Sequence, residues 1–352
     1  MKTGKTLQEM AIELDRQSKV KKDIVTDTRN FEMTPTGELA VLNNENGTRH
    51  QFPVSDHAHS QIAARLDIPA KYYNRMREQD PELLSTNVNN WFEDRPERRM
   101  IRTLDGQARA FLSDRYRRLD NYDLASSVLP VLGEMGDGIE IISAQMTETR
   151  MYIKVINKRL ELEVQKGDVV QAGMIITNSE VGLGALKVEP LIYRLICTNG
   201  MIAHDHSQKK YHVGRVAADE DAYELFSDET LKADDTAFFM KIQDTVRAAV
   251  DIAKFGTIVN RMKEAIGQRI EGDPVKAVEV VAKEFGHSDK ERSGILQHLI
   301  MGGDLSAYGM LNAITRTSQD VEDYDRATEL ERDGSRILTL PASSWRAVAT
   351  AK

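Results

Sequence analysis

The strongest constraint on the fold is an alternation of apolar and polar residues in the middle of the chain. Leu160, Leu162 and Val164 alternate with two glutamates. Successive side chains of a β-strand point to opposite faces, so this pattern predicts a strand with one buried and one wet face. Further strand-like stretches predict a β-rich, antiparallel middle, at 139–144, 151–155, 169–177 and 185–188. The apolar run at 191–197 fits either a buried strand or a buried helix.

Helical spacing dominates on either side of this middle. Apolar residues from Leu7 to Leu14 predict a short first helix, and an apolar seam from Phe239 to Ala253 predicts a packed helix hairpin. Further helices are expected at 56–66, 70–78, 121–132, 274–285, 289–301 and 305–332. The fold class is therefore α+β, with a mixed N-terminal region, a β-rich antiparallel middle and an α-helical C-terminal region.

The chain of 352 residues divides into four regions by these patterns. We expect a mixed α/β region at 1–90, a β-rich core with an arginine-rich hairpin at 91–218, an acidic linker at 219–235 and a helical region at 236–352. Within the core, Asp105-Gly106 predicts a tight turn between strands at 98–103 and 107–113. NNENG at 43–47 predicts another hairpin turn.

The net charge of −8 is unevenly distributed. Residues 219–352 hold 17 of the 47 basic and 25 of the 55 acidic side chains, so residues 1–218 are neutral. Residues 97–118 hold seven arginines against three acids. This pattern excludes a uniformly basic nucleic-acid binder, but it leaves room for a local polyanion site. The acidic segments are candidates for binding a protein partner.

Several function classes can be set aside from composition. One cysteine, Cys197, rules out an intrachain disulfide and a cysteine-only metal site, and it favours a cytoplasmic setting. After apolar neighbours, its thiol is expected to be buried and inert. The sequence has no run of 18 apolar residues, so we expect no membrane span. It has no apolar segment near the N-terminus, so we expect no signal peptide.

The arginine-rich hairpin is the strongest chemical feature. Binding of a single strand requires positive charge for phosphates and aromatic faces for bases. The candidate phosphate contacts are Arg98, Arg99, Arg102, Arg109, Arg115, Arg117 and Arg118. Phe111 or Tyr116 would stack on bases, Tyr122 lies nearby, and Lys209 and Lys210 would extend the track. The alternative is a structural network, in which the arginines pair with Asp105, Asp114, Asp120 and Asp123.

Two His-x-His pairs are candidate metal ligands. His204 and His206 flank Asp205 and would share one face of a strand, whereas His57 and His59 would diverge on a helix. The alternative for all four histidines is a surface or capping role.

Residues 59–78 resemble a helix-turn-helix. Ala63 supplies a small residue in the first helix and Ile68 an apolar residue in the turn, while Asp67 stands where glycine is usual. Tyr72 and Tyr73 are bulky for a groove-reading helix. The alternative is a helical hairpin that only packs.

Three long strings resemble a family of phage- and plasmid-like proteins that carry a domain of unknown function. They are RTLDGQARAFLSDRYRRLDN at 102–121, NSEVGLGALKVEPLIYRLICTNGM at 178–201 and LNAITRTSQDVEDYDRATELERDGSRILTLP at 311–341. Shorter matches, DHAHSQIAARLDIPAKYY and VNNWF, extend the resemblance to about residue 50. It implies a mobile-element or prophage setting in a bacterial host, and it implies no reaction and no catalytic residue.

The leading hypothesis is a non-enzymatic protein that binds or anneals single-stranded DNA or RNA as a homo-oligomer, with no cofactor. A β-rich middle with a basic hairpin is compatible with the ring-forming annealing proteins of phages, by analogy of fold only. One alternative is a metal-dependent enzyme on nucleic acid or nucleotide, using the four histidines. Another is a protein–protein adaptor or host-defence antagonist, in which the acidic segments would bind the partner.

Overall fold

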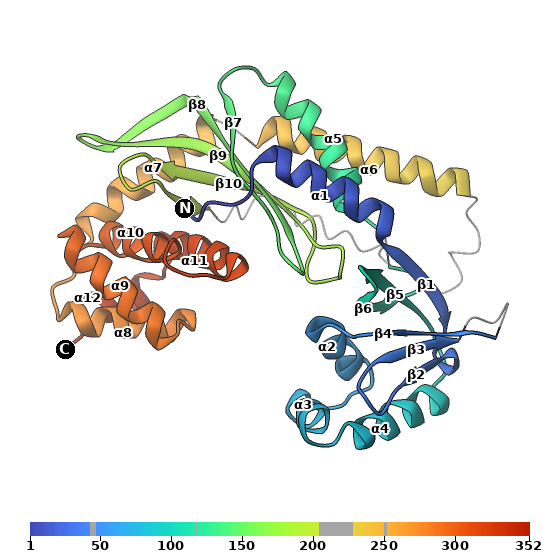
Figure 1. The fold of residues 1–352 in the computed structure, drawn as a ribbon. Helices are drawn as coiled ribbons and strands as arrows, with labels where there is room; N and C mark the ends of the chain where they lie inside the picture. The colour runs from blue at the N-terminus through green and yellow to red at the C-terminus, as the bar shows by residue number, and fades with distance from the viewer. Residues whose placement is uncertain (43–46, 117, 204–227, 250–251) are drawn as a thin grey trace.

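The computed structural model describes residues 1–42, 47–116, 118–203, 228–249 and 252–352 (Figure 1). Its helices and antiparallel sheets confirm the α+β class, with a β-rich middle and a helical C-terminal region. The NNENG turn falls largely outside the described residues. So does the first half of the expected acidic linker, while its second half begins helix α6 (Asp228–Ala248).

A five-stranded antiparallel sheet forms the centre of the molecule. Its strands lie in the order β11-β10-β9-β8-β7. Their bounds are β7 (Ile139–Met146), β8 (Met151–Gln165), β9 (Asp168–Asn178), β10 (Lys187–Arg194) and β11 (Asn199–Ile202). The apolar run at 191–197 is therefore a strand that ends in a turn.

The alternation in β8 is only partly reflected in burial. Val164 is buried and Leu160 packs against the C-terminal helices, but Leu162 is 37% exposed. Residues 151–156 are buried without alternation, because helices cover both faces of the sheet at that point.

Three helices cover one face of the sheet, namely α1 (Leu7–Val20), α5 (Asn121–Glu134) and α6. Met10, Val128 and Val246 pack there against Ile153 and Met174. The helices of the C-terminal region are α7 (Ile252–Gly267), α8 (Pro274–Phe285), α9 (Asp289–Gly302), α10 (Ala307–Thr317), α11 (Tyr324–Ile337) and α12 (Ala342–Ala349). They share one apolar cluster, in which α7 contacts β8 whereas α10 and α11 contact β11 (Figure 1).

The single helix expected at 305–332 is two helices. α10 ends at Thr317, and Asp323 starts α11 by accepting a hydrogen bond from the Arg326 N–H. The break lets α11 fold back beside α10.

The N-terminal part forms a separate layer below the large sheet in Figure 1. A small sheet has the order β2-β3-β4, and helices α2 (Asp56–Arg65), α3 (Ala70–Gln79) and α4 (Pro81–Asp94) follow it. The strands are β2 (Phe31–Met33), β3 (Leu39–Leu42) and β4 (Arg49–Phe52), after a short helical turn η1 (Thr28–Asn30). One apolar cluster holds these elements together.

A third sheet links this layer to the rest of the chain. Its order is β1-β5-β6, from β1 (Lys22–Asp27), β5 (Arg98–Leu104) and β6 (Gln107–Ser113). The predicted hairpin is confirmed, with Asp105 and Gly106 at φ of 51° and 78° as a two-residue turn requires. β1 pairs with β5, from Lys22 opposite Thr103 to Asp27 opposite Arg98, so this sheet joins residues on both sides of the boundary expected at residue 90.

Candidate nucleic-acid interface

The β1-β5-β6 sheet is covered on both faces. Ile101 and Phe111 face the N-terminal apolar cluster. Met100, Ala110 and Leu112 face the loop between β9 and β10, where they contact Val181. The sheet is therefore enclosed between the N-terminal layer and this loop, and two of its arginines, Arg102 and Arg109, are buried.

Arg102 lies at the centre of this enclosed region, with 1% of its surface exposed. Its Nε lies 2.8 Å from Asp23 Oδ1, and its Nη2 lies 2.7 Å from Asp120 Oδ1. Its Nη1 donates to the backbone oxygen of Glu180 at 3.0 Å. One guanidinium thus ties together β1, β5, the start of α5 and the loop after β9.

Glu180 is the second centre of the same region. Its carboxylate binds Arg109 and accepts the backbone N–H of Asn121 at 2.6 Å. Lys21 completes the set, 2.5 Å from Asp120 and 3.6 Å from Glu180. We call this group the arginine junction, defined as Lys21, Asp23, Arg102, Arg109, Asp120 and Glu180.

Opposite charges favour the ionised forms of Asp120 and Arg102 despite their burial. Burial acts to raise the pKa of Asp120, but Arg102 and Lys21 outweigh it and hold that pKa below its ordinary value. Burial likewise acts to lower the pKa of Arg102, but Asp120 and Asp23 outweigh it and raise that pKa. Such a network fixes geometry, because removal of one partner would leave a charge buried and unpaired.

This arrangement corrects part of the predicted site. Arg102 and Arg109 are buried in ion pairs, and Phe111 lies in the apolar core, stacked on Phe92 at 5.9 Å. Arg99 is half-buried and donates to Glu97 at 2.8 Å. In this conformation Arg102, Arg109 and Phe111 are withdrawn from the surface, whereas Arg99 keeps part of its side chain exposed. The structural-network alternative is confirmed for Asp120, whereas Asp105 pairs with Arg16 on α1.

Other members of the predicted site remain on the surface. Arg98, Arg115 and Arg118 are exposed, and Arg118 keeps a 3.3 Å contact from its Nε to Asp23. Tyr116 is half-buried and its hydroxyl donates to the Ser179 oxygen at 3.1 Å, so its ring is part of the scaffold. Tyr122 at the start of α5 is 41% exposed. Arg117, Lys209 and Lys210 lie outside the described residues.

The first histidine pair diverges, as helical spacing predicted. His57 Nε2 and the Gln61 amide both bind the Val181 oxygen at 2.8 Å, which anchors the loop after β9. His59 is buried and contacts the Tyr73 hydroxyl at 2.9 Å, and burial lowers its pKa to about 4. His57 and His59 therefore do not converge on one metal ion.

The second pair, His204 and His206, lies outside the described residues together with Asp205. Within the described part of the chain, no three His, Cys, Asp or Glu side chains are grouped in a way that could hold a metal ion.

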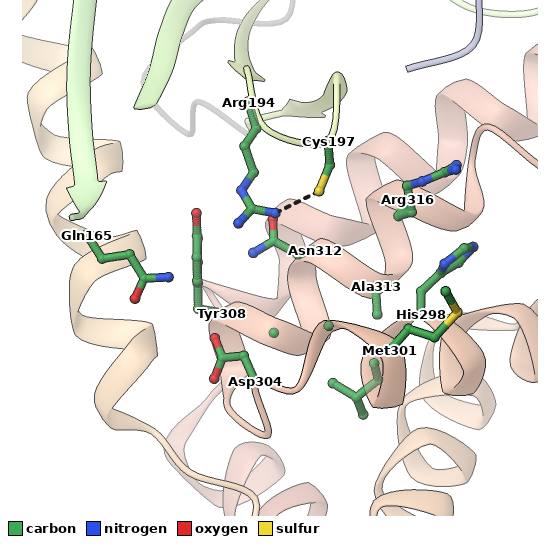
Figure 2. A pocket seen from close by; sticks show the side chains of 13 residues that line it. Gln165, Arg194, Cys197, His298, Met301, Asp304, Tyr308, Asn312, Ala313 and Arg316 are labelled. Atoms are coloured by element: carbon green, nitrogen blue, oxygen red, sulfur yellow. Dashed lines mark hydrogen bonds between the residues drawn. The ribbon is translucent and has the colours of Figure 1, made fainter. Parts of the chain in front are cut away.

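A pocket of about 280 Å³ lies between the β10–β11 turn and helices α9 and α10 (Figure 2). Arg194 donates from Nε and Nη2 to Asp168 at 2.7 and 2.6 Å, and the Tyr308 hydroxyl donates to Asp168 at 2.9 Å. Burial acts to lower the pKa of Arg194, but Asp168 outweighs it and raises that pKa. The charge of Arg194 in this pocket is therefore already neutralised by Asp168.

Cys197 borders this pocket and is half-buried, which corrects the expectation of a buried thiol. Figure 2 shows the Arg194 Nη1 donating to its sulfur, at 3.3 Å. The apolar residues before it, Leu195 and Ile196, are exposed in the turn after β10. The prediction of a buried thiol was wrong because the last residues of the apolar run lie in the turn and not in the strand.

The loop after β9 and the hairpin β5–β6 carry two of the strings on which the family resemblance rests, and the arginine junction is where they meet. The domain of unknown function DUF932 matches residues 110–336. The chain belongs to the DUF932 family. The matched DUF932 region begins within β6, ends within α11 and includes Asp120 and Glu180. No curated protein and no solved structure matches the chain. In the described part of this DUF932 protein, no helix is long and apolar enough to cross a membrane.

Sequence reasoning missed three members of the arginine junction, namely Lys21, Asp23 and Glu180. Asp23 lies 79 residues before Arg102 in the chain, Lys21 lies 99 residues before Asp120, and Glu180 lies 71 residues after Arg109. Paired charges so distant in sequence leave no local pattern.

Proposed function

We propose that the protein binds single-stranded nucleic acid, as a non-enzymatic strand-binding or strand-annealing protein of a phage, prophage or plasmid. The observation that carries the proposal is the exposure of Arg115 and Arg118, each of which lies close in sequence to a residue that the fold holds in place. Tyr116 is held by Ser179, and Asp120 is held by Arg102 and Lys21.

Anchored neighbouring residues favour binding because less conformational freedom is lost when the strand arrives. Two exposed guanidiniums suit phosphate oxygens, which they can contact in pairs of hydrogen bonds. Tyr122 supplies an exposed ring close in sequence to Arg118, and its π-face suits any base. The stacking role proposed for Phe111 and Tyr116 therefore passes to Tyr122.

Homo-oligomers are part of this proposal, because one such site covers only a few nucleotides. Strand annealing requires a longer track, which neighbouring copies would provide.

The test is fluorescence anisotropy with a labelled strand of about 30 nucleotides across a salt series. We expect binding at low salt that weakens as salt rises. Arg115→Ala combined with Arg118→Ala should reduce affinity and flatten the salt dependence by about 0.7 in the log–log slope per lost phosphate contact.

The matched control is Arg261→Ala with Lys263→Ala, which removes two exposed basic side chains from α7. This control should bind like the wild type. Absence of binding by the wild type at low salt would refute the proposal and favour the protein–protein adaptor. Equal loss in both double variants would show that only overall charge matters.

A further inference from the structure

Helices α2 and α3 meet in a turn of unusual backbone geometry. α2 ends at Arg65 and α3 begins at Ala70, so only residues 66–69 connect them. Asp67 adopts a φ of 55°, the left-handed conformation for which helix-turn-helix proteins commonly use glycine. Aspartate tolerates this conformation better than most residues. Asp67 can therefore take the place of the glycine that is usual at this position of a helix-turn-helix.

The inner faces of both helices are tightly packed. Ile62 and Ala63 of α2 are at most 2% exposed, and so are Tyr73 and Met76 of α3. Ile68 in the turn packs into the same apolar cluster. This spacing of buried residues is that of a helix-turn-helix, and it places the bulky Tyr73 inside the unit.

The outer face of α3 is open and polar, since the helix buries only Tyr73 and Met76. It exposes Lys71, Asn74, Arg75 and Gln79, together with Glu78 and the ring of Tyr72, which is 45% exposed. In the major groove, Arg and Lys bind guanine edges, whereas Asn and Gln bind adenine edges. The first turn of α3 holds no acidic residue. This face therefore has the side chains that base readout requires.

Two further features suit contacts with DNA phosphates. Pro69 is the N-cap residue of α3, and no side chain in the part of the chain described by the structure caps the first N–H groups of this helix. Arg95 lies beside the turn, with Nη1 4.0 Å from Asp67 Oδ2 and its guanidinium 4.8 Å from the centre of the Trp91 ring. Its side chain is 67% exposed, so it can reach a backbone phosphate.

We infer that α2 and α3 form a helix-turn-helix that places α3 in the major groove of duplex DNA. Asn74 and Arg75 read base edges, and Lys71 and Arg95 position the helix on the backbone. This site lies before residue 110, outside the region matched by DUF932. It is a second site for a different form of nucleic acid, and it does not depend on the single-strand proposal.

The test uses the full chain and a pool of duplexes of about 25 base pairs with a randomised centre. We expect repeated selection to enrich a common sequence. Binding of the selected duplex should weaken about 10- to 100-fold in Asn74→Ala with Arg75→Ala. Arg75→Lys keeps the charge but loses paired hydrogen bonds, so it should relax the preference for one base pair more than it lowers affinity for random duplex.

Two control variants separate this site from the other one. Arg261→Ala with Lys263→Ala should bind the selected duplex like the wild type. The Asn74/Arg75 variant should keep its affinity for single strands, which also shows that it is folded. Failure to enrich any sequence would overturn the inference. So would loss of duplex binding in the Arg115/Arg118 variant but not in the Asn74/Arg75 variant, because the duplex would then bind at the surface that carries Arg115 and Arg118.

Discussion

Lys154 of β8 and Glu331 of α11 form an ion pair of 2.6 Å in which neither side chain is exposed. Lys154 also lies 4.8 Å from the centre of the Tyr324 ring, and the Tyr324 hydroxyl lies 2.6 Å from Ser143 Oγ. The pair therefore joins the central sheet to the C-terminal helices through a polar contact within an apolar interface.

Loss of either partner of this pair should strongly destabilise the protein. Glu331→Leu leaves an ammonium group buried without a partner, so we expect the free energy of unfolding to fall by about 3–5 kcal/mol in urea titrations. Glu331→Leu combined with Lys154→Met should cost less than Glu331→Leu alone. The control is Lys158→Met, because Lys158 and Glu140 are also 2.6 Å apart but about half exposed. That variant should lose less than about 1 kcal/mol.

Asp23 contacts both Arg102 and Arg118, and the two contacts should contribute differently to stability because the first is buried and the second is half-exposed. Arg102→Leu should lower the free energy of unfolding by about 3–5 kcal/mol, because Asp23 and Asp120 would lose their buried partner. Arg118→Ala removes a half-exposed contact and should cost less than about 1 kcal/mol. Thermal unfolding of both variants measures the difference, and equal losses would contradict the structural role of Arg102.

His59 should make stability depend on pH. Burial lowers its pKa to about 4 in the folded protein, against 6.5 ordinarily. The unfolded chain therefore takes up a proton between these values while the folded chain does not. The resulting stabilisation is complete above about pH 6.5 and is lost as pH falls toward 4, by about 2–4 kcal/mol.

Urea midpoints between pH 4 and 7.5 measure this effect. His59→Gln keeps a polar group near Tyr73 but cannot titrate, so its profile should be flatter than that of the wild type. Parallel profiles would show that other groups cause the dependence.

Gly182 should be sensitive to substitution because the loop after β9 packs closely on the hairpin. A Cβ there would lie 2.7 Å from Leu112 Cδ2, whereas a Cβ at Gly106 would meet nothing within 4 Å. Both residues have φ of 78°, so alanine costs about 1–2 kcal/mol of backbone strain at either position. Gly182→Ala should cost more than Gly106→Ala by the amount of the collision, measured by urea unfolding. Equal losses would mean that Leu112 moves aside freely.

The hairpin β5–β6 was predictable because its signal is local. Asp105-Gly106 matches the backbone that a two-residue turn needs, and apolar strands flank it. The burial of Arg102 was not predictable, because its partners Asp23 and Asp120 are brought together only by the fold. A cluster of arginines therefore has the same sequence pattern whether it binds a polyanion or a carboxylate network.

The prediction of a single helix at 305–332 was wrong for a physical reason. Asp323 can cap a helix as well as lie within one, and the periodicity of α10 continues into α11 without a proline to mark the break. The divergence of His57 and His59 was predictable, because residues two apart on a helix never share a face.

The pairing of β1 with β5 has a consequence for how proteins of this kind can diversify. Asp27 of β1 and Arg98 of β5 are partners on adjacent strands. The chain therefore leaves β1, forms the whole N-terminal layer and returns in β5 beside the point where it left. Residues 28–97 are thus a cassette with adjoining ends. A different cassette that covers Ile101 and Phe111 with apolar residues could replace it through two neighbouring junctions. New target preferences could then arise by exchange, while the ion pairs of the arginine junction, whose members all lie outside residues 28–97, stay intact.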